Sequence, residues 1–147
     1  MNMKPRRNNT VLIIEDDDDI RTFTARVLEL EGYEVLETGS GAVGLATIRE
    51  KAIDLVVLDL RLPDLDGWAF LQEIKNSPEL ANIPVVVLTA IAETTQRKKT
   101  LKMGASSYLV KPLSAANLSG TVAGFLKETI PLQQTETRRR PGAPIVR

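Results

Sequence analysis

Apolar residues are distributed along this chain in two alternating patterns. Short runs of nearly continuous apolar residues, the first at positions 11–14, are each followed by a longer segment in which apolar residues recur every three or four positions. The short runs are typical of strands covered on both faces, and the longer segments are typical of amphipathic helices. The predicted strands occupy positions 11–14, 33–37, 54–60, 83–90 and 107–110.

Capping residues and helix breakers predict where the intervening helices begin and end. The first helix is expected to begin at Asp18 or Asp19 and to end at Gly32. Its buried face is expected to carry the large apolar residues at helical spacing, which are Ile20, Phe23, Val27 and Leu30. The later helices are expected over about 40–51, 68–77, 92–103 and 114–130, with Ser40 and Ser114 as N-caps.

Strands and helices that alternate in this way predict an α/β fold with a parallel sheet, since a helical crossover joins each strand to the next. In open sheets of this kind, functional groups lie beyond the carboxyl ends of the strands, where the strand order reverses. The residues that follow the predicted strands are therefore the first candidates for function.

Polar side chains of a few types stand at those strand ends. They are Glu15 and Asp16 after the first strand, Asp59 in the third, Thr89 in the fourth and Lys111 after the fifth. Each by itself is an ordinary turn or cap residue. Three carboxylates, a hydroxyl and an ammonium group at one edge of a sheet together suit a metal ion and a phosphoryl group, with Thr89 and Lys111 meeting phosphoryl oxygens.

The run of five acids at positions 15–19 needs something to offset its charge. Two like charges about 4 Å apart repel by roughly 4 kcal/mol at an effective dielectric constant near 20. A Mg²⁺ or Mn²⁺ ion would relieve this repulsion, with Asp16 and Asp59 as direct ligands and Glu15 bound directly or through water. A carboxylate in such a site can act as a nucleophile and form an aspartyl phosphate.

The composition excludes several other function classes. The chain has no His, which rules out a Ser-His-Asp triad and a histidyl phosphodonor within this sequence. It has no Cys, so thiolate metal sites and disulfides are absent, which fits a cytoplasmic protein. No apolar run is long enough to span a bilayer, and no Gly-rich loop follows the first strand to bind a dinucleotide.

The motifs VLIIEDD, LVVLDLRLPDLDG, VVVLTA and GASSYLVKP resemble those of the receiver domains of bacterial two-component response regulators, the chemotaxis-type fold. The resemblance runs from about Val11 to Glu128, and the intervals between Asp59, Thr89 and Lys111 also match those of the family. It implies a doubly wound (βα)5 domain whose five parallel strands have the flavodoxin-like order 2-1-3-4-5.

The same resemblance implies a role for each candidate residue. Asp59 is the expected phosphoacceptor, in an acidic metal site completed by Glu15, Asp16 and the backbone carbonyl of Arg61. The expected switch residues are Thr89 and Tyr108, the expected phosphate-binding residue is Lys111, and the Lys111–Pro112 bond is expected to be cis, as is usual in the family. Glu15 stands where Asp is commoner in the family, and we expect function to be retained.

Charge divides the chain into three parts. The stretch from Thr10 to Ile130 has 12 basic and 18 acidic residues, whereas both ends are basic. We expect a flexible arm at 1–9, the receiver domain at 10–130 and a disordered tail at 131–147. No aromatic residue is interleaved with the arginines of the tail, so no nucleic-acid binding is expected from it.

These features predict a stand-alone receiver rather than an enzyme. The expected phosphodonor is a sensor histidine kinase or a histidine phosphotransfer protein, and the expected output is a protein partner bound to the face formed by the fourth helix, fifth strand and fifth helix. The alternatives are a receiver-like scaffold that works without phosphorylation and a phosphohydrolase with an Asp nucleophile. The phosphohydrolase is disfavoured because its acids would follow the first strand as Asp-x-Asp and its cap would need longer loops.

Overall fold

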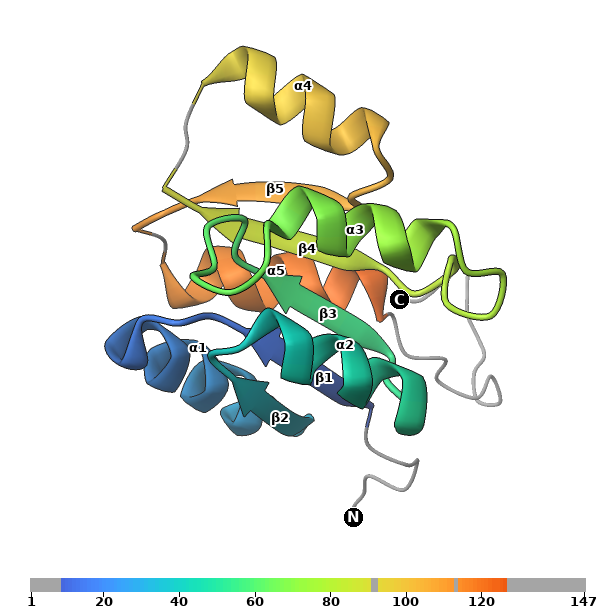
Figure 1. Cartoon of the computed structure of the whole chain (residues 1–147). Coiled ribbons are helices and arrows are strands. Elements are labelled where there is room, and N and C mark those ends of the chain that lie inside the picture. Colours follow the sequence, from blue (N-terminus) through green and yellow to red (C-terminus); the bar gives the residue numbers. More distant parts are fainter. Residues whose placement is uncertain (1–8, 91–92, 113, 127–147) are drawn as a thin grey trace, which may run out of the picture.

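The computed structural model describes residues 9–90, 93–112 and 114–126, and these residues form five strands alternating with five helices (Figure 1). The strands are β1 (Thr10–Ile14), β2 (Glu34–Thr38), β3 (Leu55–Leu58), β4 (Val85–Thr89) and β5 (Ser107–Val110). The helices are α1 (Asp18–Leu30), α2 (Gly41–Glu50), α3 (Gly67–Lys75), α4 (Thr94–Lys102) and α5 (Ala115–Phe125). The expected basic tail, the expected arm apart from Asn9 and the expected start of the fourth helix at Ala92 lie outside the described residues.

All strand pairs are parallel, and the sheet has the order β2-β1-β3-β4-β5. This confirms the α/β class and the predicted order. The order reverses at β1, which pairs with β2 on one side and with β3 on the other. The carboxyl ends of β1 and β3 are in register, with Ile14 opposite Leu58, so the residues after them are neighbours.

Helices cover both faces of the sheet (Figure 1). An apolar layer of side chains lies between each face and its helices. Leu12 and Ile14 face α2 and α3, whereas Val11 and Ile13 face α1 and α5, as alternate side chains of a strand must. Helix α4 contributes only the half-buried Leu101 to the first layer. No helix among the described residues has both the length and the apolar character that crossing a membrane requires.

Side-chain caps fix three helix starts as the sequence predicts or close to it. Ser40 accepts a hydrogen bond from Val43 N at the start of α2, and Ser114 accepts one from Asn117 N at the start of α5. The cap of α1 is Asp17, which accepts from Ile20 N at 3.0 Å. The expected start at Asp18 is confirmed, whereas the cap is Asp17 rather than Asp18 or Asp19, since consecutive Asp residues are equally good caps by composition.

The predicted buried face of α1 is only partly confirmed, because Ile20 and Val27 are half-buried against the apolar layer but the other two residues are not. Phe23 is 44% exposed and Leu30 is 78% exposed, while the buried residues of the helix are Thr24, Ala25 and Leu28. Small residues on the inner face let the helix lie close to the sheet. Thr24 tolerates full burial because its hydroxyl donates a hydrogen bond to Ile20 O at 2.7 Å.

The loop between β3 and α3 is pinned by a close backbone approach. Gly67 N donates to Leu60 O at 3.0 Å, and a Cβ on Gly67 would lie 2.4 Å from Leu60 Cα. Asp64, in the same loop, reaches the N-terminus of α2. There it accepts hydrogen bonds from Ser40 Oγ, Gly41 N and Ala42 N at 2.9, 2.9 and 3.1 Å. These contacts hold the segment that follows Asp59 against the N-terminus of α2.

Helix α4 is held to α3 by polar contacts. Trp68 Nε1 donates to Thr100 Oγ1 at 2.9 Å, and Lys99 Nζ lies 4.8 Å from the centroid of the Trp68 ring. Thr100, the only buried residue of α4, donates in turn to Gln96 O at 2.7 Å. The apolar stripe of α4 is therefore thin, with Leu101 as its one residue packed against the core.

Candidate functional site

Backbone hydrogen bonds continue past the strand ends and fix the candidate residues at one edge of the sheet. Glu15 N donates to Thr38 O at 3.0 Å, and Asp59 N donates to Ile14 O at 3.0 Å. Lys111 N donates to Thr89 O at 2.8 Å. Each candidate thus follows its strand directly in extended pairing, which places the side chains beyond the sheet rather than beneath a helix.

Carboxylate oxygens of Glu15, Asp16 and Asp59, the acidic cluster, all lie within 4.8 Å of one another. Glu15 and Asp59 are buried, whereas Asp16 is exposed, so the cluster opens to solvent on one side. Three hard oxygen donors in this arrangement fit a small divalent cation such as Mg²⁺. The structure therefore brings together the three carboxylates that the sequence singled out.

Lys111 joins this cluster from the far side of the sheet. Its Nζ lies 2.7 Å from Glu15 Oε1 and 3.3 Å from Asp59 Oδ2. Among the described residues, Glu15 Oε1 is fully buried and makes no hydrogen bond apart from this ion pair. A buried carboxylate oxygen with spare acceptor capacity is a second indication that the cluster suits a cation.

Burial and neighbouring charges have opposite effects on the pKa values of Glu15 and Lys111. Burial raises the pKa of Glu15 to about 7, against the lowering effect of Lys111 and of the Asp17 amide. Burial alone would lower the pKa of Lys111, but the carboxylates of Glu15 and Asp59 outweigh it and raise that pKa above its ordinary value. Lys111 therefore carries its charge at neutral pH, whereas Glu15 is ionised in only part of the molecules.

The two oxygens of Asp59 have different partners. Oδ1 accepts a hydrogen bond from Arg61 N at 3.1 Å, and Oδ2 accepts one from Lys111 Nζ. Arg61 is exposed and its backbone bridges to Asp66, which caps α3. The metal-binding role of the Arg61 carbonyl stays a prediction.

The two expected switch residues lie on the neighbouring strands β4 and β5. Thr89 ends β4 and is fully buried. Tyr108 pairs with Val87 across the sheet, is 4% exposed and belongs to the apolar layer under α3. Burial raises its pKa, and Glu93 raises it further against Arg97. Tyr108 therefore already occupies an inward position here, and its role as a switch stays a prediction.

An apolar hollow that the sequence pattern did not predict lies beside Lys111. The hollow has a volume of about 520 Å³. It is lined by Asp19, Ile20, Phe23, Ala90, Lys111 and Pro112. The Lys111–Pro112 bond on its rim is cis, as expected. The signal was present in Phe23, but that residue was assigned to the buried face of α1.

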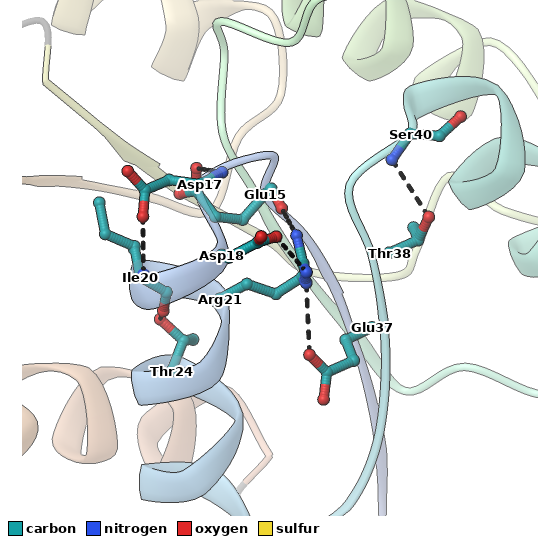
Figure 2. A network of polar contacts seen from close by, with 9 residues as sticks. All are labelled: Glu15, Asp17, Asp18, Ile20, Arg21, Thr24, Glu37, Thr38 and Ser40. Atoms are coloured by element: carbon teal, nitrogen blue, oxygen red, sulfur yellow. Dashed lines mark hydrogen bonds and ion pairs between the residues drawn. The ribbon is translucent and has the colours of Figure 1, made fainter.

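Arg21 is a second cation next to the acidic run, and it was not among the predicted site residues. Its guanidinium reaches from α1 to the backbone of Glu15 and to the side chains of Asp18 and Glu37 (Figure 2). The spacing of three residues between Asp18 and Arg21 on a helix was an available signal for the first of these ion pairs. Glu37, on β2, could be linked to Arg21 only through the fold.

Comparison with known proteins gives one family. Residues 11–123 match the family described as response regulator receiver domain. The DNA-binding dual master transcriptional regulator RpaA of Synechocystis is 34% identical over 119 residues, which are 81% of this chain and 49% of that protein. The chain spans about half the length of the curated relatives it matches.

Solved structures agree with this result. The receiver domain of response regulator 1452 from Francisella is 31% identical with a TM-score of 0.76, covering 82% of this chain and 98% of that one. The receiver domain of a sensor histidine kinase from Pseudomonas aeruginosa is 27% identical with a TM-score of 0.76, covering 83% and 100%. That structure is described with a magnesium ion coordinated in its active site cleft.

Proposed function

Because this chain belongs to the response regulator receiver domain family, we propose that it accepts a phosphoryl group on Asp59 in a Mg²⁺-dependent reaction. One observation carries the proposal. The oxygens of Glu15, Asp16 and Asp59 cluster within 4.8 Å, and Lys111 Nζ contacts Asp59 Oδ2. The chain would serve as the acceptor of one phosphoryl group rather than as an enzyme with turnover.

In this reaction an Asp59 oxygen attacks phosphorus, and the bond from phosphorus to the donor nitrogen breaks, leaving that nitrogen with the donor. Glu15, Asp16 and Asp59 would hold Mg²⁺, which supplies positive charge opposite the phosphoryl oxygens when bound. Lys111 would move its ammonium group from the carboxylates to a phosphoryl oxygen. That shift is favoured because the phosphoryl group adds about −1.5 to −2 charge at pH 7.

The donor would be a second protein that carries a phosphohistidine, a sensor histidine kinase or a histidine phosphotransfer protein. This chain has no His of its own. The apolar hollow opens beside Lys111, and Phe23 on its wall is 44% exposed. An exposed aromatic residue beside the acceptor offers a contact for a donor protein that a small phosphodonor does not need.

The output would pass through Thr89 and the face formed by α4, β5 and α5. Thr89 ends the strand next to β5, and the segment after it leads to α4, whose one buried residue is Thr100. A phosphoryl group on Asp59 would draw the Thr89 hydroxyl toward it. Because α4 is held mainly by polar contacts, only a small change in free energy would be needed to shift it.

The test is the intact mass of the protein after incubation with Mg²⁺ and acetyl phosphate. We expect one added phosphoryl group on the parent protein and on Glu79→Gln, a change in an exposed carboxylate outside the cluster. We expect none on Asp59→Asn, or on the parent protein with a chelator. Uptake by Asp59→Asn equal to that of the parent protein would reject Asp59 as the acceptor. No uptake by the parent from acetyl phosphate or from a protein donor would favour a scaffold that works without phosphorylation.

A further inference from the structure

Arg21 contacts the acidic cluster through a backbone atom rather than through a carboxylate of the cluster. Its Nη1 donates to Glu15 O at 2.9 Å, while Nη2 lies 2.6 Å from Asp18 Oδ1 and Nε lies 3.4 Å from Glu37 Oε1 (Figure 2). The side chain of Arg21 is 21% exposed. One guanidinium thus joins the end of β1, the first turn of α1 and strand β2.

The carbonyl that Arg21 holds belongs to the peptide unit between Glu15 and Asp16. A peptide unit is planar, so fixing its oxygen also fixes the orientation of the Cα atoms on both sides. Those two Cα atoms carry two of the three carboxylates of the acidic cluster. Asp17 N, one residue further, donates to Glu15 Oε2 at 3.1 Å and depends on the same geometry.

The guanidinium of Arg21 is closely packed against the turn that follows β2. Gly39 lies opposite, where an added Cβ would be 3.2 Å from Arg21 Nη1, 3.4 Å from Asp16 Cα and 3.6 Å from Glu15 O. The turn after β2 therefore packs directly on the bond between Arg21 and the acidic loop, defined as residues 15–17. This arrangement leaves the guanidinium little freedom to adopt another position.

We propose that Arg21 is a positioning residue for the metal site, which holds the Glu15–Asp16 peptide so that both carboxylates converge with Asp59. The inference rests on the proposed function for the identity of the ion. The contacts of Arg21 are with Glu15 O, Asp18 and Glu37, so it would act on the site through the backbone. Groups that orient metal ligands in this way commonly change metal affinity by about 10- to 100-fold when they are replaced.

Whether Mg²⁺ binding becomes weaker or tighter when Arg21 is replaced distinguishes a positioning role from a purely electrostatic one. Removing a positive charge near the cluster should by itself strengthen Mg²⁺ binding, since the ion meets less repulsion. Arg26 is exposed on the same helix, so Arg26→Met is a matched control for that charge change. Weaker binding by Arg21→Met but not by Arg26→Met can then come only from lost positioning.

The experiment is calorimetric titration with Mg²⁺ alone, together with amide hydrogen exchange of the metal-free proteins by NMR. We expect roughly tenfold or weaker Mg²⁺ binding for Arg21→Met, unchanged or slightly tighter binding for Arg26→Met, and partial recovery for Arg21→Lys. We also expect the Asp17 amide to exchange faster in metal-free Arg21→Met, with unfolding midpoints of all variants close to that of the parent.

Two results would overturn the assignment. They are Mg²⁺ binding by Arg21→Met as tight as by the parent, and an Asp17 amide whose exchange does not change. If the parent itself binds no Mg²⁺, the proposed function loses its metal site. The exchange of Asp17 in the metal-free proteins then still decides whether Arg21 orders the acidic loop.

Discussion

Lys111 Nζ lies 2.7 Å from Glu15 Oε1, although the two residues follow β5 and β1, which are separated in the sheet by β3 and β4. The lysine thus spans the width of the site. It also places a protein cation among the same carboxylates that would hold Mg²⁺. Lys111 therefore stabilises the acidic cluster in the absence of a metal ion. A bound Mg²⁺ would replace part of this stabilisation.

Replacing Lys111 with Met should lower the free energy of unfolding by about 2 kcal/mol at neutral pH without Mg²⁺, because two buried carboxylates lose their partner. Glu15 limits the loss by taking up a proton, since burial raises its pKa to about 7 even with Lys111 present, and Lys111 lowers that pKa. Added Mg²⁺ should stabilise Lys111→Met more than the parent. Urea unfolding with and without Mg²⁺ measures both effects.

The matched control for this prediction is Lys98→Met, which removes an exposed lysine of α4. It should change the free energy of unfolding by no more than about 0.5 kcal/mol. An equal effect of the two substitutions would show that the ion pair with Glu15 contributes nothing specific.

Phe23→Ser should slow phosphoryl transfer from a protein donor by roughly tenfold while leaving uptake from acetyl phosphate unchanged. The loss of one exposed aromatic contact commonly costs a little over 1 kcal/mol in a protein interface, which corresponds to that factor. The measurement is the ratio of the two rates. Leu30→Ser, at the other end of α1 and 78% exposed, is the control and should leave both rates unchanged. Equal slowing with both donors would place the effect in the phosphorylation site instead.

Asp64 should make stability depend on pH. Hydrogen bonds from Gly41 N, then Ala42 N and Ser40 Oγ, lower the pKa of Asp64 below its usual value. Because the pKa is lower in the folded protein, the stabilisation is present above the unfolded pKa near 4 and is lost as the pH falls through the folded pKa. The stability difference between the parent and Asp64→Asn should therefore shrink in acid.

Urea unfolding at neutral pH and in acid tests the pH dependence. Glu79→Gln changes an exposed acid elsewhere and should show no comparable trend. A difference between the parent and Asp64→Asn that stays constant across this pH range would contradict the role of the ionised carboxylate at the start of α2.

Gly67→Ala should destabilise the protein by about 2 kcal/mol or more, because its Cβ would lie 2.4 Å from Leu60 Cα and 2.7 Å from Leu60 O. Backbone atoms cannot turn aside as a flexible side chain can. Gly120→Ala is the control, since nothing lies within 4 Å of a Cβ at that position of α5. It should stabilise by roughly 0.5–1 kcal/mol. Thermal unfolding of both variants checks the pair, and equal shifts of the same sign would contradict the prediction.

The sequence is sufficient for the order of elements and for the edge at which the polar residues meet. Continuous apolar runs such as 11–14 and 85–88 predict covered parallel strands, and parallel strands bring their ends together. The acidic cluster follows from that topology. Its pairing with Lys111 does not, because the topology gives the edge of the sheet but not the direction of a long flexible side chain.

Two other features escape sequence reasoning for identifiable reasons. Phe23 was expected inside because apolar periodicity favours the largest residues, whereas the inner face of α1 consists partly of Thr24 and Ala25. Asp64 reaches the start of α2 from more than twenty positions away, and no local pattern indicates such a cap. Both errors concern which neighbour a residue meets in three dimensions, which propensity does not encode.

The polar character of helix α4 bears on the solubility of the protein. Its ties to α3 are the hydrogen bond between Trp68 and Thr100 and the contact of Lys99 with the Trp68 ring, and its exposed positions include four cations, Arg97, Lys98, Lys99 and Lys102. If α4 shifts, water can replace the polar contacts that break, and little apolar surface becomes exposed to solvent. If α4 shifts as proposed, the shifted form would therefore remain soluble at high protein concentration.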